Sequence, residues 1–338
     1  MPAVRLLPAA GVALSATAIF AAWIGWRVGG PSTALYVDDI ATVGAALAAS
    51  LLCLRAAGRQ VGALRRSWWL LGAACASWTL GEVLWAIHDL ILQDAVPVPS
   101  WADLGYLGAI PLAVAALLSH PTMAGRAAHR ARDTLDGLLV ATALLFVSWT
   151  LVLGPLWHST DLTKLGGLVT LAYPFGDVVI LFFVVRAVRR MAPGNRYPLW
   201  CLLAGLLALA SSDSAYAYLT AAHGYQAGGV LDSGWFAGYL AIAVGAACSP
   251  PAQIAAPDAD SHEPALAALV VPFMPILGAL GVVALKPELV QRLDGVAFAS
   301  ASALVALVLA RQLLVLRDFT GLERSQRSTP TERHGSLR

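Results

Sequence analysis

Three acidic residues lie inside long apolar stretches, where a carboxylate is energetically costly: Glu82, Asp177 and Asp213. Asp103 and Asp232 lie at the ends of two further apolar stretches. No lysine or arginine lies deep in any of these stretches to neutralise the acids. Because an ionisable group inside a membrane span is expensive and usually marks a functional site, the five acids predict one polar pocket.

Aromatic residues accompany these acids at helical spacing. Trp78, Glu82 and Trp85 follow an i, i+4, i+7 pattern and would share one face of a helix. Each of the other acids has an aromatic residue three or four positions away in the sequence. The candidate ligand-binding residues are therefore Glu82, Trp78, Trp85, Asp103, Tyr106, Tyr173, Asp177, Asp213, Tyr216, Asp232 and Trp235.

A carboxyl group buried in a membrane span can be stabilised in several ways. Without an internal cation, each acid can hold a proton, accept hydrogen bonds from indole, phenol or hydroxyl groups, or bind a cationic ligand. Asp103 and Asp232 can equally cap the starts of their helices. For Glu82, Asp177 and Asp213, a ligand or proton-relay role competes with a structural role as hydrogen-bonded contacts between helices.

The composition places the chain in a membrane. Of its 338 residues, 58% are hydrophobic and only 12% are charged, with a mean hydropathy of +0.70. A soluble domain carries about 25% charged residues. The four cysteines form no CxxC pair and have no histidine at metal spacing, so we expect no disulfide, no metal site and no cofactor. A nucleic-acid partner is not expected either.

The apolar stretches predict an all-α, polytopic bundle of about ten transmembrane helices. A bilayer core of about 30 Å requires about 20 apolar residues of helix. Continuous rather than alternating apolarity excludes a β-barrel. The predicted spans are residues 7–28, 36–56, 68–92, 103–119, 134–155, 165–188, 197–220, 231–249, 264–285 and 293–315.

Basic residues in the short loops predict the orientation. Arginines gather after the second, fourth and sixth spans and in residues 317–338, whereas the opposite loops hold few basic residues. We therefore expect both termini in the cytoplasm, with a transmembrane domain over residues 1–316 and a short tail that is disordered at its polar end. In this orientation the five acids occupy the outer half of the membrane, whereas Asp136 lies near its cytoplasmic side.

Two stretches of the chain resemble each other. Residues 77–121 and 211–250 each contain an acid with a nearby aromatic residue, a loop, an aspartate, a Tyr-Leu pair and a proline. The similarity predicts a parallel repeat of residues 65–190 and 197–315. In such a repeat Glu82 and Asp213 would be equivalent positions about a pseudo-twofold axis.

Three ordered motifs carry a resemblance to a known membrane region. They are Pro99–Asp103 (PSWAD) followed by Tyr106-Leu107, Ala172–Asp177 (AYPFGD), and Ser212–Tyr216 (SDSAY) followed by Gly224-Tyr225 and Leu231–Trp235 (LDSGW). Residues 65–315 resemble the polytopic N-terminal region of actinobacterial cyclic-di-GMP signalling proteins. The resemblance implies a multi-pass protein of the bacterial plasma membrane with a signalling role. It implies no particular ligand.

Relatives in that group continue into GGDEF cyclase or EAL phosphodiesterase domains, whereas this sequence ends at Arg338 without either motif. We therefore expect a sensory module without its own output domain and without enzymatic activity. It would bind a small ligand from the extracytoplasmic side and act on a cytoplasmic signalling protein.

Other functions compete with sensing. Intramembrane acids also suit a transporter of a proton, a cation or an amine, and Pro174 and Gly176 beside Asp177 could interrupt the sixth span at a binding site. An intramembrane enzyme has little support, because the sequence contains no HExxH, GxSxG or clustered histidines. A scaffold that recruits a soluble partner is a further alternative.

Overall fold

The computed structural model describes residues 2–93, 97–120, 127–159, 164–189, 197–221, 224–250, 281, 284 and 294–327. These residues are helical or in loops, without strands, and include nine helices long and apolar enough to cross a membrane. The nine helices correspond to nine of the ten predicted spans. The remaining one, residues 264–285, lies outside the described residues apart from residues 281 and 284.

The chain forms two compact units, residues 1–124 with 147–269 and residues 125–146 with 270–338. The helices of the first unit are α1 (Pro2–Gly25), α2 (Pro31–Gly58), α3 (Gly62–Ala86) continued by η1 (Ile87–Leu92), α4 (Trp101–Ser119), η2 (Trp149–Leu153), α6 (Gly154–Ser159), α7 (Leu165–Arg189), α8 (Tyr197–Ala221), η4 (Val230–Asp232) and α9 (Ser233–Ala247). The second unit contains most of α5 (Ala127–Ser148) and α13 (Gly295–Arg327).

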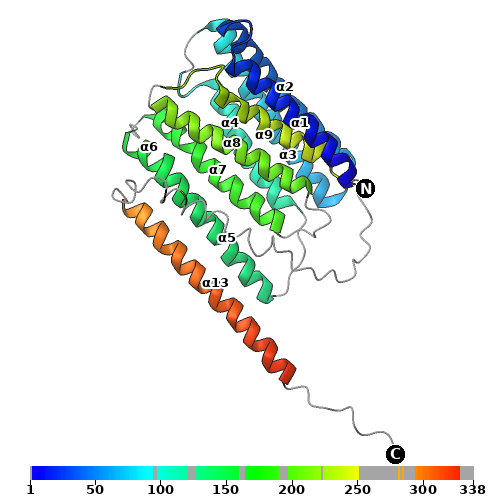
Figure 1. Ribbon diagram of the computed structural model, residues 1–338, viewed down its shortest axis with the longest axis vertical. Helices are drawn as coiled ribbons and strands as arrows, with labels where there is room; N and C mark the ends of the chain where they lie inside the picture. Colours follow the sequence, from blue (N-terminus) through cyan, green and yellow to red (C-terminus); the bar gives the residue numbers. More distant parts are fainter. Residues whose placement is uncertain are drawn as a thin grey trace, which may run out of the picture. The chain divides into compact units, whose positions relative to one another are not determined.

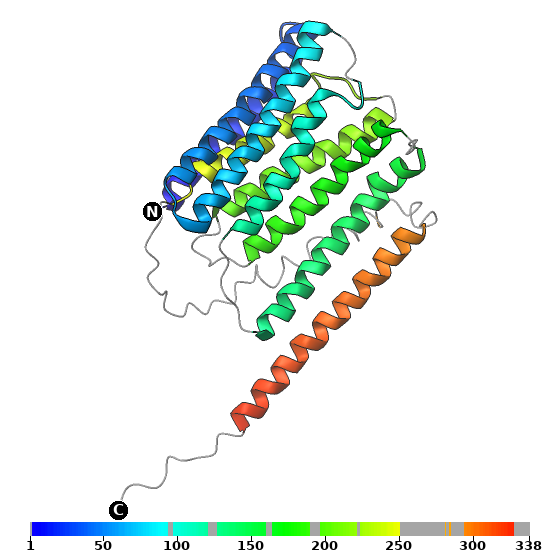
Figure 2. The same ribbon diagram turned by 180° about the vertical axis from the view of Figure 1, so that it is seen from behind.

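Six helices of the first unit form a closed ring. Going round the ring, α2 contacts α3, α3 contacts α4, α4 contacts α7, α7 contacts α8, α8 contacts α9, and α9 contacts α2. Helix α1 lies outside the ring against α9 and α2, and Figure 1 and Figure 2 show these helices side by side. Elements far apart in the sequence therefore meet around one centre.

Buried apolar side chains, many of them alanine or cysteine, fill the centre of one half of the ring. The C-terminal halves of α2, α4 and α9 and the N-terminal halves of α3 and α8 supply most of these residues. They include Ala46, Ala49, Cys53, Ala74, Cys75, Ala113, Ala116, Val184, Leu199, Leu202, Ile242 and Ala246, each at most 3% exposed. These side chains are therefore closely packed, as in the core of a soluble protein.

Glycines set the closest helix approach in the ring. A Cβ atom added at Gly105 of α4 would lie 2.5 Å from the backbone nitrogen of Gly81 on α3 and 2.8 Å from the carbonyl oxygen of Ser77. At the crossing of α8 and α9, a Cβ at Gly234 would overlap the hydroxyl of Ser212. Helices can approach this closely only where a small residue stands at the crossing.

Proline and glycine do not interrupt α7, which runs from Leu165 to Arg189 with Pro174 inside it. The predicted break beside Asp177 is therefore absent. Gly176 instead makes room for the side chain of Ile110 on α4. The motif thus brings α4 and α7 together.

In the second unit, α5 and α13 are joined by apolar and ionic contacts. Leu139, Ala143 and Leu304 form a buried cluster. Beside it, the Arg311 guanidinium donates through Nε to Asp136 Oδ1 at 2.5 Å, and the two residues are 3% and 0% exposed. Helix α13 continues to Arg327, past the predicted end of its span, and residues 328–338 lie outside the described residues.

Candidate functional site

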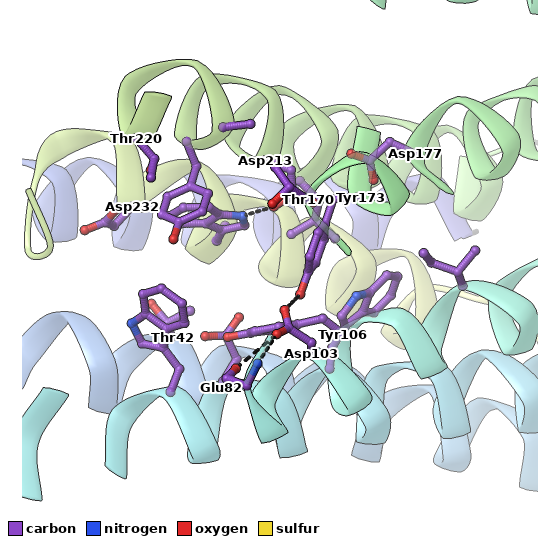
Figure 3. Close-up of a pocket in the computed structure, with 18 of the residues that line it drawn as sticks. Thr42, Glu82, Asp103, Tyr106, Thr170, Tyr173, Asp177, Asp213, Thr220 and Asp232 are labelled. Carbon is purple, nitrogen blue, oxygen red and sulfur yellow. Dashed lines mark hydrogen bonds between the residues drawn. The ribbon is translucent and has the colours of Figure 1, made fainter. Parts of the chain in front are cut away.

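The ring of the first unit encloses a cavity of about 520 Å³, a size within the range of small-molecule sites. All eleven residues predicted to form the site line it: Trp78, Glu82, Trp85, Asp103, Tyr106, Tyr173, Asp177, Asp213, Tyr216, Asp232 and Trp235. Figure 3 shows Glu82 and Asp103 facing Asp213 and Tyr173 across this space. The six ring helices thus bring together residues from more than half the length of the chain.

Among the residues that the structure describes, seven that line the cavity carry a carboxyl group, and none of the lining residues is a lysine, arginine or histidine. Sequence analysis predicted five of these acids. Asp38 and Asp39 were not among the candidates, although they fall near the start of the predicted second span, residues 36–56. Helix α2 begins one and a half turns earlier, at Pro31, and carries both aspartates into the ring. The signal available in the sequence was the i, i+4 spacing of Asp38 and Thr42, which places both residues on one face of a helix.

Asp103 both caps a helix and lines the cavity. Its Oδ2 accepts the backbone N–H of Ser100 at 2.5 Å, which completes a capping box at the start of α4. Its Oδ1 accepts the hydroxyl of Tyr173 from α7. The capping and pocket interpretations of this residue therefore hold together in one geometry.

Asp232 repeats the arrangement at the start of α9. Its Oδ2 accepts the backbone N–H of Gly229 at 3.0 Å, and its Oδ1 accepts the hydroxyl of Tyr225 at 3.1 Å. Burial and the neighbouring carboxylates raise the pKa of Tyr225 above its ordinary value. Tyr225 therefore keeps its proton at neutral pH and remains a donor to Asp232.

Glu82 and Asp213 receive hydrogen bonds from other helices of the ring. The hydroxyl of Tyr239 on α9 donates to Glu82 Oε1 at 2.8 Å. The indole N–H of Trp235 on α9 donates to Asp213 Oδ1 at 2.7 Å. These contacts join α3 and α8 to α9, so both carboxyl groups also hold the ring together.

Within the described part of the chain, four buried polar atoms on the cavity wall have no hydrogen-bond partner. They are Asp38 Oδ1, Asp39 Oδ2, Thr42 Oγ1 and Asp177 Oδ2. Asp38, Asp39 and Thr42 are only 6%, 8% and 6% exposed. A buried acceptor without a partner costs about 1–3 kcal/mol and more when charged, so these atoms favour a donor that enters the cavity.

Aromatic rings line the space between the acids. Trp85 and Tyr216 meet edge to face with ring centroids 6.0 Å apart, and Tyr216 also lies edge to face against Trp235 at 6.0 Å. Their faces carry partial negative charge and attract cations within about 6 Å. Carboxylates and aromatic faces in one cavity therefore share a preference for positive charge.

The carboxyl groups are dispersed around the wall. Among the residues that the structure describes, no three histidine, cysteine, aspartate or glutamate side chains are arranged to hold a metal ion. A ligand with several N–H donors and an apolar body suits dispersed carboxylates and aromatic walls better than a small ion does.

No protein-family model matches this chain, and comparison with curated proteins and with solved structures gives no match either.

Proposed function

We propose that this chain is a sensory module of the bacterial cell membrane that binds an organic cation in the cavity of its six-helix ring. The observation that carries the proposal is the wall of seven carboxyl groups without a basic residue among those lining it. An ammonium or guanidinium group would supply donors to the unpartnered oxygens Asp38 Oδ1, Asp39 Oδ2 and Asp177 Oδ2.

The extent of the cavity favours sensing over transport. On α4, α7 and α8, the lining residues between the acids and the packed half of the ring are apolar: Ile110, Ile180, Leu181, Leu206 and Leu209. Beyond them lie the closely packed alanines and leucines of the other half of the ring. A cavity with an apolar floor suits a ligand that enters and leaves from one side, whereas a transporter would also need a second arrangement that opens the site to the other side.

The arginine-rich loops support an outward orientation of the cavity. If these loops face the cytoplasm, the N-terminal ends of α2, α4 and α9 face the outside, and the cavity opens there. The ligand would then come from the extracytoplasmic side. The resemblance of the motifs to cyclic-di-GMP signalling proteins supports a cytoplasmic signalling protein as the partner.

Contacts at the opposite end of the ring offer a route for the signal. Arg59 donates to the carbonyl oxygen of Ala246 at 3.1 Å, and Gln60 donates to that of Pro250 at 2.5 Å. These bonds tie the end of α2 to the end of α9. A ligand that binds one conformation of α2 more tightly would raise the population of that conformation, and the linked ends of α2 and α9 would change with it.

Binding without uptake is the outcome expected from proteoliposomes that contain the purified full chain. The probe is labelled ethylguanidinium, which stays charged at neutral pH and does not leak through lipid as a free amine does. We expect saturable binding and no accumulation in the lumen under an imposed membrane potential or proton gradient. Accumulation above that of protein-free liposomes would contradict sensing and establish transport.

A further inference from the structure

The unpartnered oxygens of the cavity fall into two groups on two different helices. Asp38, Asp39 and Thr42 belong to α2, and Asp177 belongs to α7. The other four lining acids each accept at least one hydrogen bond from the protein, and Asp38 accepts one only at its second oxygen, Oδ2, from the backbone N–H of Gly228 at 3.2 Å. The cavity therefore has two places where a ligand could supply missing donors.

These two places lie on opposite sides of the ring. Helices α3 and α4 separate α2 from α7 on one side, and α8 and α9 separate them on the other. Figure 3 shows Thr42 and Asp177 at opposite ends of the cavity, on opposite walls. A single ammonium group cannot contact both places at once.

The two halves of the ring have matching contacts. Gly105, two residues after Asp103, crosses α3 at Gly81, which precedes Glu82; Gly234, two residues after Asp232, crosses α8 at Ser212, which precedes Asp213. In this register α3 corresponds to α8, α4 to α9 and Glu82 to Asp213, whereas α7 falls in the second half rather than in the first, where the predicted repeat of residues 65–190 and 197–315 places it.

The register also pairs α2 with α7. Tyr173 of α7 donates to Asp103, and Asp38 of α2 lies beside Asp232. Thr42 follows Asp38 by four residues, as Asp177 follows Tyr173. Trp85 follows Glu82 by three residues, as Tyr216 follows Asp213. The two places with missing donors are thus approximate twofold equivalents, with an aromatic pair between them.

From this arrangement we propose that the ligand is a linear dication, a diamine or polyamine with an amine at each end. One ammonium group binds at Asp38, Asp39 and Thr42, and the other binds at Asp177. The methylene chain between them lies along Trp85 and Tyr216. This inference rests on the proposed organic-cation function and specifies the ligand class.

The test compares linear α,ω-diamines with n-alkylamines of the same carbon count. Binding is measured by isothermal titration calorimetry on the detergent-purified full chain at neutral pH. Because the second ammonium binds intramolecularly once the first is held, we expect an optimal diamine to bind at least about tenfold more tightly than its matched monoamine. Shorter and longer diamines should bind progressively less tightly.

Asparagine at either end should remove this advantage. The variants Asp39→Asn and Asp177→Asn should each reduce diamine affinity to about that of the monoamine, while monoamine affinity changes little, because the other end remains. The matched control is Asp294→Asn; Asp294 lies outside the cavity and accepts the backbone N–H of Ala297 at 2.9 Å. This control should retain the wild-type preference.

The outcomes separate the two proposals. If amines bind but diamines have no advantage at any length, or keep it in both variants, the ligand is not a bridging dication, whereas the organic-cation function stands. If no amine binds to the wild-type protein, the organic-cation function itself is wrong.

Discussion

Replacing Arg311 with methionine is expected to destabilise the second unit by about 3–5 kcal/mol, because the change leaves the carboxylate of Asp136 buried without its partner. Both side chains are almost fully buried, and the guanidinium Nε lies 2.5 Å from Asp136 Oδ1. Unfolding of the purified variant in mixed detergent micelles, followed by circular dichroism, measures the loss. The apolar stem of methionine preserves most of the contact with α5.

A double variant distinguishes the lost ion pair from lost packing. Asp136→Leu combined with Arg311→Met removes both charges and should recover most of the stability, because a buried pair can often be replaced by apolar residues at little cost. The single variant Asp136→Leu should be as unstable as Arg311→Met. Equal stability of the wild type and both single variants would show that the pair contributes nothing.

Substituting alanine for Gly105 should lower the free energy of unfolding by about 1–3 kcal/mol. The added methyl group would overlap backbone atoms of α3, so the two helices would have to separate. The closest of these atoms, the nitrogen of Gly81, would lie 2.5 Å from the new Cβ. The separation of α3 and α4 should also displace Tyr106 and Glu82 from the cavity wall. Thermal unfolding and amine binding of the same preparation report the two effects.

Gly44 provides the matched control for this substitution. It lies within α2, and a Cβ atom there would have no neighbour within 4 Å. Gly44→Ala should therefore be neutral or slightly stabilising, since alanine favours helix by up to about 1 kcal/mol over glycine. If Gly105→Ala unfolds at the same temperature as Gly44→Ala, α3 and α4 do not meet as described.

Apolar length was sufficient to predict the helices, because the bilayer requires long continuous spans. Nine of the ten predicted spans have a matching helix among the described residues. Helix starts were less predictable. Pro31 at the start of α2 is a favoured first residue of a helix, but the span was predicted to begin at residue 36. Asp38 and Asp39, close to this start, were not included in the predicted site, although both line the cavity.

Local spacing identified the residues of the cavity but not their partners. Asp232 and Trp235 share one helix face, yet the indole of Trp235 donates to Asp213 on α8. Likewise, Glu82 receives the hydroxyl of Tyr239 from α9 rather than an indole of its own helix. Spacing determines which face a residue occupies, whereas the partner depends on which helices meet, and the ring order is not encoded in any local pattern.

Long-range pairing also explains why the Asp136–Arg311 contact was not predicted. Asp136 was recognised as an exception among the acids, and Arg311 lies within the predicted final span. The two residues are 175 positions apart in the sequence. Nothing in the composition of either span indicates that α5 and α13 are neighbours.

The central claim is that the cavity selects an organic cation. The most direct measurement is calorimetric binding of an n-alkylammonium ion and of the alcohol with the same number of carbons to the detergent-purified full chain. We expect saturable binding of the ammonium ion and no measurable binding of the alcohol, because only the cation satisfies the unpartnered carboxylates. Equal affinity for the alcohol, or binding of neither compound, would contradict it.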